Sequence, residues 1–518
     1  MNRTRIITAA ALALATGGLV FAGPINPPAG PAASTYKTLT EVEPRIAINL
    51  TNTPGDADSL FKITQRGSYY LTGNTTGVVG KHGIEIAASG VTLDLMGFDL
   101  SGIPAMGAFD GVSVAINSLT NITVRNGSVR GWGDEGVDFF AFAAANSAIL
   151  DIRASGNAGN GILTGSGSTI SGCTANDNTG NGIQTSFGCT ITGCTVQNNS
   201  NGISTGSGCT ISGCSANDNN VHGISTTLNC TITGCTVENN NSNGIFASSG
   251  CTITGCTAND NTGNGIFASS SCTISECTAR SNSTRGIFIG TDCSIIGCTV
   301  AANSIAGIDA GAQCSILKTT VSGTSAGPGV TSIFEGLRIE GSSINNNSTF
   351  GVTVNTTSDL AELAVINCTI RGNGSAGISS EASTQVLDSV VASNGAGVIL
   401  TGSGLIRGCT INSNTNSGIE LTGNANVVAN NTLSSNALTL ATSAGVLVTG
   451  ADNTIDGNRL FSNVQGGIKV NSGGNLVVRN YLARTGATIT AVAGNAVAQI
   501  ISPGAGFIST DPNANFTY

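Results

Sequence analysis

The segment NGIQTSFGCTITGCTVQNNS, residues 181–200, decides the fold. Its Gly-Ile pair recurs every 20 or 21 residues, and a Cys-Thr-Ile-Thr-Gly-Cys-type block follows each recurrence. A fixed period near 20 residues in a Thr-, Asn- and Gly-rich sequence is typical of a solenoid with one coil per repeat. The regular recurrences begin at Gly182, Gly202, Gly223, Gly244, Gly265, Gly286 and Gly307.

The same landmark, Gly followed by Ile or Val, extends the repeat in both directions. It occurs before the regular part at Gly83, Gly111, Gly136 and Gly161, and after it at Gly329, Gly351, Gly377, Gly397, Gly418, Gly445 and Gly467. We therefore expect a solenoid over residues 83–485, with a cap at 41–82 and a C-terminal cap or tail at 486–518.

The repeats predict short β-strands. They contain no Ala/Leu/Glu/Lys run with helical periodicity, but alternating Ile, Val and Thr between Gly, Asn and Ser. Within one repeat, Cys189 and Ile191 share a parity and should point inward, whereas Thr190 and Thr192 should point outward. Gly193 makes a corner. These features predict an all-β, single-stranded parallel β-helix of about 21 residues per coil, with coils about 4.8 Å apart.

Asparagine marks one bend of each coil. It stands four residues before the landmark glycine at Asn157, Asn178, Asn198, Asn219, Asn240, Asn261, Asn282, Asn303, Asn347, Asn373, Asn414 and Asn463. Stacked side-chain amides can donate and accept hydrogen bonds between successive coils. We expect this asparagine ladder to be structural.

Fourteen of the sixteen cysteines form two series, one through Cys189 and the other through Cys194, and Cys368 and Cys409 stand apart. Cysteine is a small apolar residue that is often buried, so both series can stack inside the coils as thiols. An even number in an exported chain also allows disulfides between coils. The Cys-x4-Cys spacing could suggest a metal, but no histidine accompanies it.

The first residues predict export. Residues 1–22 combine Arg3 and Arg5 with an apolar stretch and a small-residue cleavage site after Ala22, as in a secretory signal peptide. A Pro/Ala-rich linker follows at 23–40. No other segment is long and apolar enough to span a membrane. We expect an extracellular, cell-surface or periplasmic protein.

The low proportion of charged residues in the chain limits the classes of partner that we expect. Charged residues make up 9% of the chain and the net charge is −9. No basic stripe exists to neutralise phosphates, so nucleic acid is not an expected partner. We predict no cofactor, and no motif indicates calcium, although calcium remains possible.

The repeat resembles that of right-handed parallel β-helix proteins of the pectate-lyase-like superfold. The opening stretch Asp58–Gly73, the segment Arg125–Gly133 and the terminal Asn513–Tyr518 resemble uncharacterised exported bacterial β-helix proteins. The resemblance implies right-handed coils. It implies little about activity, because this fold carries lyases, hydrolases, epimerases and adhesins. The paired aspartates and Gly-His-Gly motif of its hydrolases are absent from the sequence.

One candidate site lies on the N-terminal coils, where longer spacings leave extra loop residues. The candidate catalytic residues there are Arg125, Arg130, Asp134, Asp138 and Arg153. Trp132, the single tryptophan, lies in Gly-Trp-Gly, where its ring could be open to a sugar. The alternative is that these residues secure the N-terminal cap, with Trp132 filling a coil end and Arg125 paired with an aspartate.

A second candidate site is an aromatic stripe. Phe246, Phe267 and Phe288 stand two residues after successive landmark glycines, where side chains should point outward. Such a ladder can bind a glycan or a partner protein. The alternative is that another segment covers it.

Two functions remain open. The first is a non-enzymatic exported protein that binds a polysaccharide or builds cell-surface structure. The second is a polysaccharide lyase or related carbohydrate-active enzyme with its site on the N-terminal coils.

Overall fold

A computed structural model describes residues 43–140, 145–356, 362–502 and 509–518. The predicted signal peptide at 1–22 and linker at 23–40 lie outside the described residues. The chain divides into two units, residues 1–45 and 46–518, and the strands belong to the second. None of the described residues forms a helix, and none of the described segments is a helix that could cross a membrane.

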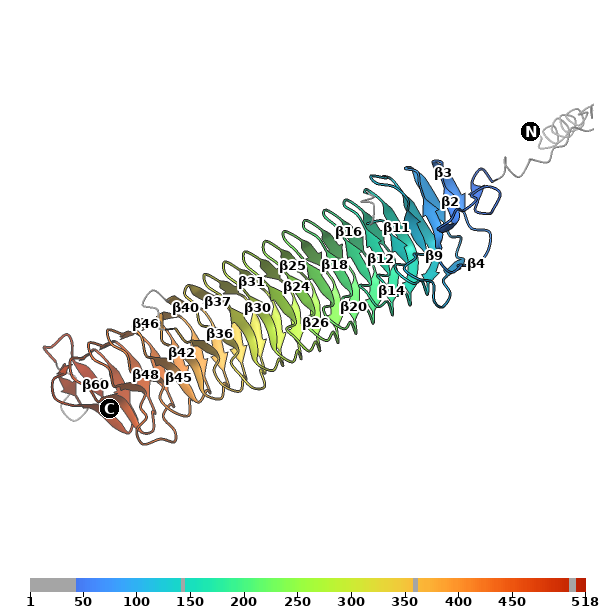
Figure 1. Cartoon of the computed structure of the whole chain (residues 1–518). Helices are drawn as coiled ribbons and strands as arrows, with labels where there is room; N and C mark the ends of the chain where they lie inside the picture. The colour runs from blue at the N-terminus through green and yellow to red at the C-terminus, as the bar shows by residue number, and fades with distance from the viewer. Residues whose placement is uncertain (1–42, 141–144, 357–361, 503–508) are drawn as a thin grey trace, which may run out of the picture. The chain divides into compact units, whose positions relative to one another are not determined.

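The described residues between 46 and 518 form a parallel β-helix (Figure 1). It has about 21 turns with about 21 residues per turn. One coil consists of β15 (Ile183–Thr185), β16 (Thr190–Thr192) and β17 (Thr195–Gln197). Each strand pairs in parallel with its counterpart one coil later, as β15 does with β18 (Ile203–Thr205). The predicted fold class is confirmed.

Side chains alternate between the interior and solvent as predicted. Ile183, Ile191 and Val196 are fully buried, and the equivalent residues of other coils stack on them. Thr190 and Thr192 are exposed. The core is therefore a set of ladders of Ile, Val and Ala that run along the solenoid axis.

The regular coils turn at three residues with left-handed backbone. In the coil that contains β16 these are Gly188, Gly193 and Asn198, with φ of 65°, 60° and 55°. The residue after each corner points inward and is buried, and here these residues are Cys189, Cys194 and Asn199. Two of the three corners use glycine because it adopts positive φ without steric cost.

The asparagine ladder exists, but one predicted member is wrong. Asn199 occupies the ladder in its coil and is fully buried, whereas Asn198 is an exposed corner residue. This coil has 20 residues, and the missing one falls between Asn199 and Gly202. The offset of four residues therefore fails there. The sequence offset also missed Asn394 and Asn436, which continue the ladder with hydrogen bonds to Asn414 and Asn463.

The landmark glycines make room for this ladder. A Cβ atom at Gly223 would lie 2.7 Å from Asn240 Nδ2, and one at Gly244 would lie 2.7 Å from Asn261 Nδ2. Both distances are too short for real contacts. The Gly-Ile period thus follows from the close approach of each coil to the asparagine of the next.

The cysteines behave as ladder residues of the same kind. The Cys189 N–H donates to Cys209 Sγ at 3.3 Å, and Cys189 Sγ donates to the Gly165 carbonyl at 3.3 Å. All sixteen cysteines are buried and unpaired. In the series through Cys194, other hydrogen-bonding residues take this position in later coils, and these are Thr319, Ser342, Ser389, Asn431, Asn458 and Asn480. A buried thiol here satisfies backbone groups, as a hydroxyl or amide does elsewhere.

The segments predicted as caps join the solenoid. Within 41–82, β2 (Ser59–Ile63) pairs in parallel with β5 (His82–Ile86). Within 486–518, β57 (Ala487–Ala491) pairs with β54 (Gly466–Val470). The last strand, β60 (Asn515–Thr517), completes the final coil.

Candidate functional site

Two of the predicted catalytic arginines are ion-paired across coils. Arg125 Nη2 lies 3.1 Å from Asp94 Oδ2, and Arg130 Nε donates to Asp99 Oδ2 at 2.7 Å. Both arginines come from β9 (Thr123–Arg130), on either side of a corner in that strand. The alternative expected Arg125 to pair with an aspartate, and the Arg125–Asp94 pair is present. That these residues secure the N-terminal coils stays a prediction.

Of the other three candidates, Arg153 lies on the neighbouring strand β11 (Ala148–Ser155) and the two aspartates lie elsewhere. Arg153 Nε donates to Ser128 Oγ at 3.1 Å. Asp138 is buried on the opposite sheet, where its Oδ1 accepts the Phe140 N–H at 2.8 Å. Asp134 lies in the turn that precedes that strand. Arg130 and Arg153 therefore share one face of adjacent strands, whereas Asp138 lies on the opposite sheet, and the five residues do not converge on one centre.

The expectation of an open Trp132 ring is wrong. The side chain is 1% exposed, and its Nε1 donates to the Leu100 carbonyl at 3.1 Å. A Cβ atom at Gly83 would lie 2.8 Å from the ring, so the surrounding glycines leave space for it. Its backbone N–H donates to Asn157 Oδ1, at the first asparagine of the ladder. Trp132 fills the interior of the N-terminal coils.

Three carboxyl groups do gather on the N-terminal coils. Oxygen atoms of Asp110, Asp134 and Glu135 all lie within 4.8 Å of one another. Burial, together with the neighbouring Asp134 and Asp110 carboxylates, raises the pKa of Glu135 to about 8. Carboxylate oxygens are the ligands that Ca²⁺ prefers. Among the described residues, this cluster is one of two groups that could hold such an ion.

The second cluster of carboxylates lies beside a lysine that supplies a positive charge. It consists of Asp56, Asp58 and Glu85. Lys62 Nζ lies 2.6 Å from Asp56 Oδ2 and 2.7 Å from Glu85 Oε2. This lysine stands where a cation would have to bind.

The aromatic stripe points outward, as predicted, and its rings stack on one another. The ring centroids of Phe246 and Phe267 are 4.9 Å apart with planes 9° from parallel, and those of Phe267 and Phe288 are 5.1 Å apart with planes at 8°. His222 extends the stack by one ring at 5.0 Å from Phe246. Arg285 lies over the last ring, 5.3 Å from the Phe288 centroid. The ring faces are therefore covered, and the ring edges form the outer surface.

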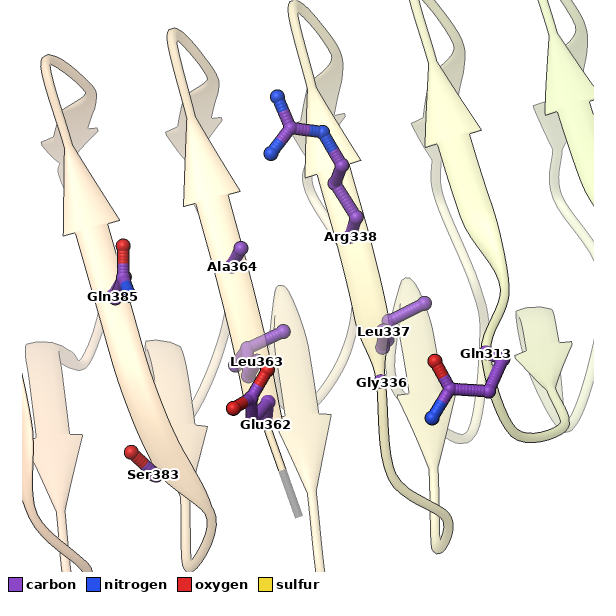
Figure 2. A pocket seen from close by; sticks show the side chains of 9 residues that line it. All are labelled: Gln313, Gly336, Leu337, Arg338, Glu362, Leu363, Ala364, Ser383 and Gln385. Atoms are coloured by element: carbon purple, nitrogen blue, oxygen red, sulfur yellow. The ribbon is translucent and has the colours of Figure 1, made fainter. Parts of the chain in front are cut away.

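A hollow of about 230 Å³ lies on the outer side of another sheet (Figure 2). It spans β37 (Leu337–Glu340), β40 (Glu362–Ile366) and β43 (Ser383–Leu387). In the strand register Ala364 stands between Arg338 and Gln385. A single methyl group between two long side chains produces the depression.

The hollow is bordered by polar groups with few internal partners. Gln313, Glu362, Ser383 and Gln385 make no side-chain hydrogen bond or ion pair within the described part of the chain. Arg338 Nη2 is paired with Glu340 Oε2 at 2.6 Å on its own strand. The hollow thus offers two amides, a hydroxyl and one carboxylate to a ligand.

Sequence reasoning missed this site. In earlier coils the outward position that Arg338, Ala364 and Gln385 occupy is Thr or Ser, as at Thr273 and Ser294. The replacement of Thr or Ser by other residues at this position was the signal in the sequence that could have indicated the hollow. It becomes visible only when the strands are placed in register.

The family model for the right handed β-helix region matches residues 61–210, 185–326, 269–405 and 379–502. The chain belongs to this family. The right-handed coils implied by the resemblance are thereby confirmed. A comparison with curated proteins finds no match.

Solved structures to which the chain is similar include pectate lyase Pel9A, with 17% identity, a TM-score of 0.30, and 40% of this chain and 69% of that chain covered. The periplasmic alginate epimerase AlgG has 11% identity and a TM-score of 0.28, with coverage of 65% and 81%. Pre-mature bacteriophage phi29 gene product 12 has 12% identity and a TM-score of 0.37, with coverage of 88% and 69%. With TM-scores below 0.5, these likenesses carry no conclusion about this chain, and its family rests on the family model.

Proposed function

We propose that this protein is an exported, non-enzymatic β-helix that binds a polysaccharide or another cell-surface glycan. The observation that carries the proposal is the hollow over Ala364, with its unpartnered side chains. Amide groups both donate and accept hydrogen bonds, which suits the hydroxyl groups of a sugar. The volume is below the roughly 300–1,000 Å³ of pockets for drug-sized ligands, so we expect one sugar unit of a chain to occupy it.

Charge at the hollow indicates which sugars fit. Arg338 is neutralised by Glu340, whereas Glu362 has no cationic partner among the described residues. The net local charge is negative. We therefore propose a neutral or amino sugar, and we expect uronate units to bind less well there because their carboxylates would face Glu362.

The aromatic stripe is a second surface proposed for a glycan chain. Phe246, Phe267 and Phe288 present ring edges, which carry partial positive charge and can contact sugar oxygens. Because the ring faces are covered, the stripe would act as an edge-on contact and not as a stacking platform.

The glycan proposal is tested by filling the hollow. Ala364→Trp should abolish binding of the glycan identified on a panel of neutral, amino and uronate polysaccharides, as measured by calorimetry. Ala429→Trp, at a half-buried outward position of β49 (Val427–Ala429), is the matched control and should bind normally. Gln385→Ala should weaken binding by about 2- to 10-fold, the loss of one hydrogen bond. Equal binding by the Ala364→Trp variant and the unmodified protein would refute the proposal.

A second candidate function is a carbohydrate-active enzyme at the N-terminal coils. The observation that favours it is the Glu135 carboxyl, whose pKa of about 8 would keep it protonated at neutral pH, beside Asp110 and Asp134. Such a pair of unequal carboxyl groups is the arrangement that acid–base catalysis on glycosidic bonds requires. Product release from uronate and neutral polymers, absent in Glu135→Gln, would establish this function. Identical rates in the two proteins would exclude it.

A further inference from the structure

Six consecutive coils carry a two-column array of hydroxyl groups on one sheet. The strands are β13 (Thr169–Ser171), β16, β19 (Thr210–Ser212), β22 (Thr231–Thr233), β25 (Thr252–Thr254) and β28 (Thr273–Ser275). The first column is Thr169, Thr190, Thr210, Thr231, Thr252 and Thr273, each in register with the next. The second column is Ser171, Thr192, Ser212, Thr233, Thr254 and Ser275.

The array is regular in two directions. Successive strands lie about 4.8 Å apart, and alternate residues along a strand lie about 6.6 Å apart. The buried ladders on both sides of each strand hold these positions. At β16, Cys189 and Cys194 are the buried residues that flank the strand, and each hydrogen-bonds to a neighbouring coil. The backbone positions that carry the hydroxyls are thus held before any ligand arrives.

The hydroxyls of the first column are available to water. Every threonine of the first column is exposed, and none of their hydroxyls has a partner among the described residues. In the second column, Thr192 and Ser212 lie within 3.2 Å of one another, and Thr254 and Ser275 within 3.0 Å. Neither column contains a charged residue over these six coils.

Neighbouring surfaces lack these properties. The adjacent sheet face carries threonine and serine in one column, but Gln197, Asn217 and Glu238 in the other. On the array's own sheet the pattern ends at Ile296, and Arg338 and Glu340 appear two coils later. The regular uncharged hydroxyl array is therefore confined to one face of these coils.

We propose that this array binds ice. Its two repeats are close to the distances between water oxygens on crystal faces of ice, so a row of threonine hydroxyls can take the place of a row of water molecules. The threonine methyl groups between the rows add apolar contact with the crystal surface. Because the strands that carry the hydroxyls are already ordered, binding requires no further ordering of the backbone. Charged side chains, which would hold water in other arrangements, are absent from the array.

Ice binding is tested by freezing behaviour. The purified protein should hold ice crystals at a constant size below the melting point and give them flat faces. Thr231→Tyr/Thr252→Tyr places two large rings in the centre of the array and should lose the freezing-point depression. Thr236→Tyr/Thr257→Tyr makes the same change on the adjacent face of the same coils and should retain it.

The outcomes are separable from those of the glycan proposal. Thermal unfolding of both double variants establishes that each is folded at the freezing point. Round, unshaped crystals grown in the presence of the unmodified protein would overturn the inference, as would equal loss in the two variants. Neither result bears on the hollow over Ala364, which lies on later coils.

Discussion

Asn240 donates its side-chain N–H to Asn261 Oδ1 at 2.9 Å, and its backbone N–H donates to the same oxygen at 3.0 Å. One amide oxygen thus satisfies two donors of the preceding coil. The same hydrogen bonds repeat along the solenoid. Each asparagine therefore accepts from the preceding coil and donates to the next. Removing one member leaves buried partners on both sides.

Asn240→Leu should therefore lower the free energy of unfolding by about 1–3 kcal/mol, because neighbouring amides lose buried partners. Urea denaturation measures the change. Asn241→Leu, at the exposed neighbouring position, should change stability by no more than about 0.5 kcal/mol. Equal effects of the two substitutions would show that the ladder contributes nothing specific.

The thiols should resist alkylation while the protein is folded. All sixteen are buried, so the alkylating reagent cannot reach them in the folded protein. Burial also raises the pKa of the Cys409 thiol to about 11, so this thiol stays protonated near neutral pH. After denaturation without reductant, most should react with iodoacetamide. Mass spectrometry counts the labelled residues. Quantitative cross-linking before labelling would mean that the ladders are disulfide scaffolds.

Cys409 offers a direct test of the role assigned to the thiols. Its backbone N–H donates to Asn431 Oδ1 at 2.9 Å, and its Sγ donates to the Val386 carbonyl at 3.4 Å. An asparagine can make both interactions. Cys409→Asn should therefore retain most of the stability, whereas Cys409→Leu should cost about 1–3 kcal/mol for an unsatisfied carbonyl and overpacking. The opposite order would indicate that apolar burial is what the position requires.

The position of a residue within the repeat made it possible to predict which side chains are buried. Cys189 and Ile191 follow Gly182 at the same sequence spacing as their counterparts in the other regular repeats. Their parity and burial therefore follow from the period. Asn199 was missed because its coil is one residue short, and an offset counted from the glycine does not see where the residue is lost. Spacing within the repeat was enough to predict the buried residues of the regular coils, but not those of coils that have lost a residue.

Side-chain direction in the irregular coils was not predictable. The flanking Gly131 and Gly133 suggested an open Trp132 ring, but distant Gly83 and Gly111 leave the interior space that the ring occupies. The hollow depends on Ala364 lying beside residues 26 positions before it and 21 after it. Only the strand register brings such residues together.

Stability should depend on pH through Glu135. The folded protein raises the pKa of this carboxyl to about 8, against about 4.3 in an unfolded chain. Between these values the folded state holds a proton that the unfolded state has lost. Stability should therefore decrease as pH rises from about 4.5 to about 8 and then level off. Glu135→Gln should reduce this dependence and be the more stable protein at pH 8, as measured by urea denaturation. Glu238→Gln, on another coil, should keep the slope of the unmodified protein.

Trp132 and the aromatic stripe should differ in what they do for stability. Trp132 fills the interior and is 1% exposed, so Trp132→Ala should cost about 3–5 kcal/mol. The combined change of Phe246, Phe267 and Phe288 to Ser should cost less, because each stacked pair on the surface contributes roughly 0.5–1.5 kcal/mol. Thermal unfolding of the two proteins compares these effects, with Trp132→Phe as the control that keeps an aromatic ring inside. A larger loss for the triple variant would mean that the stripe, and not Trp132, belongs to the core, and would remove it as a binding surface.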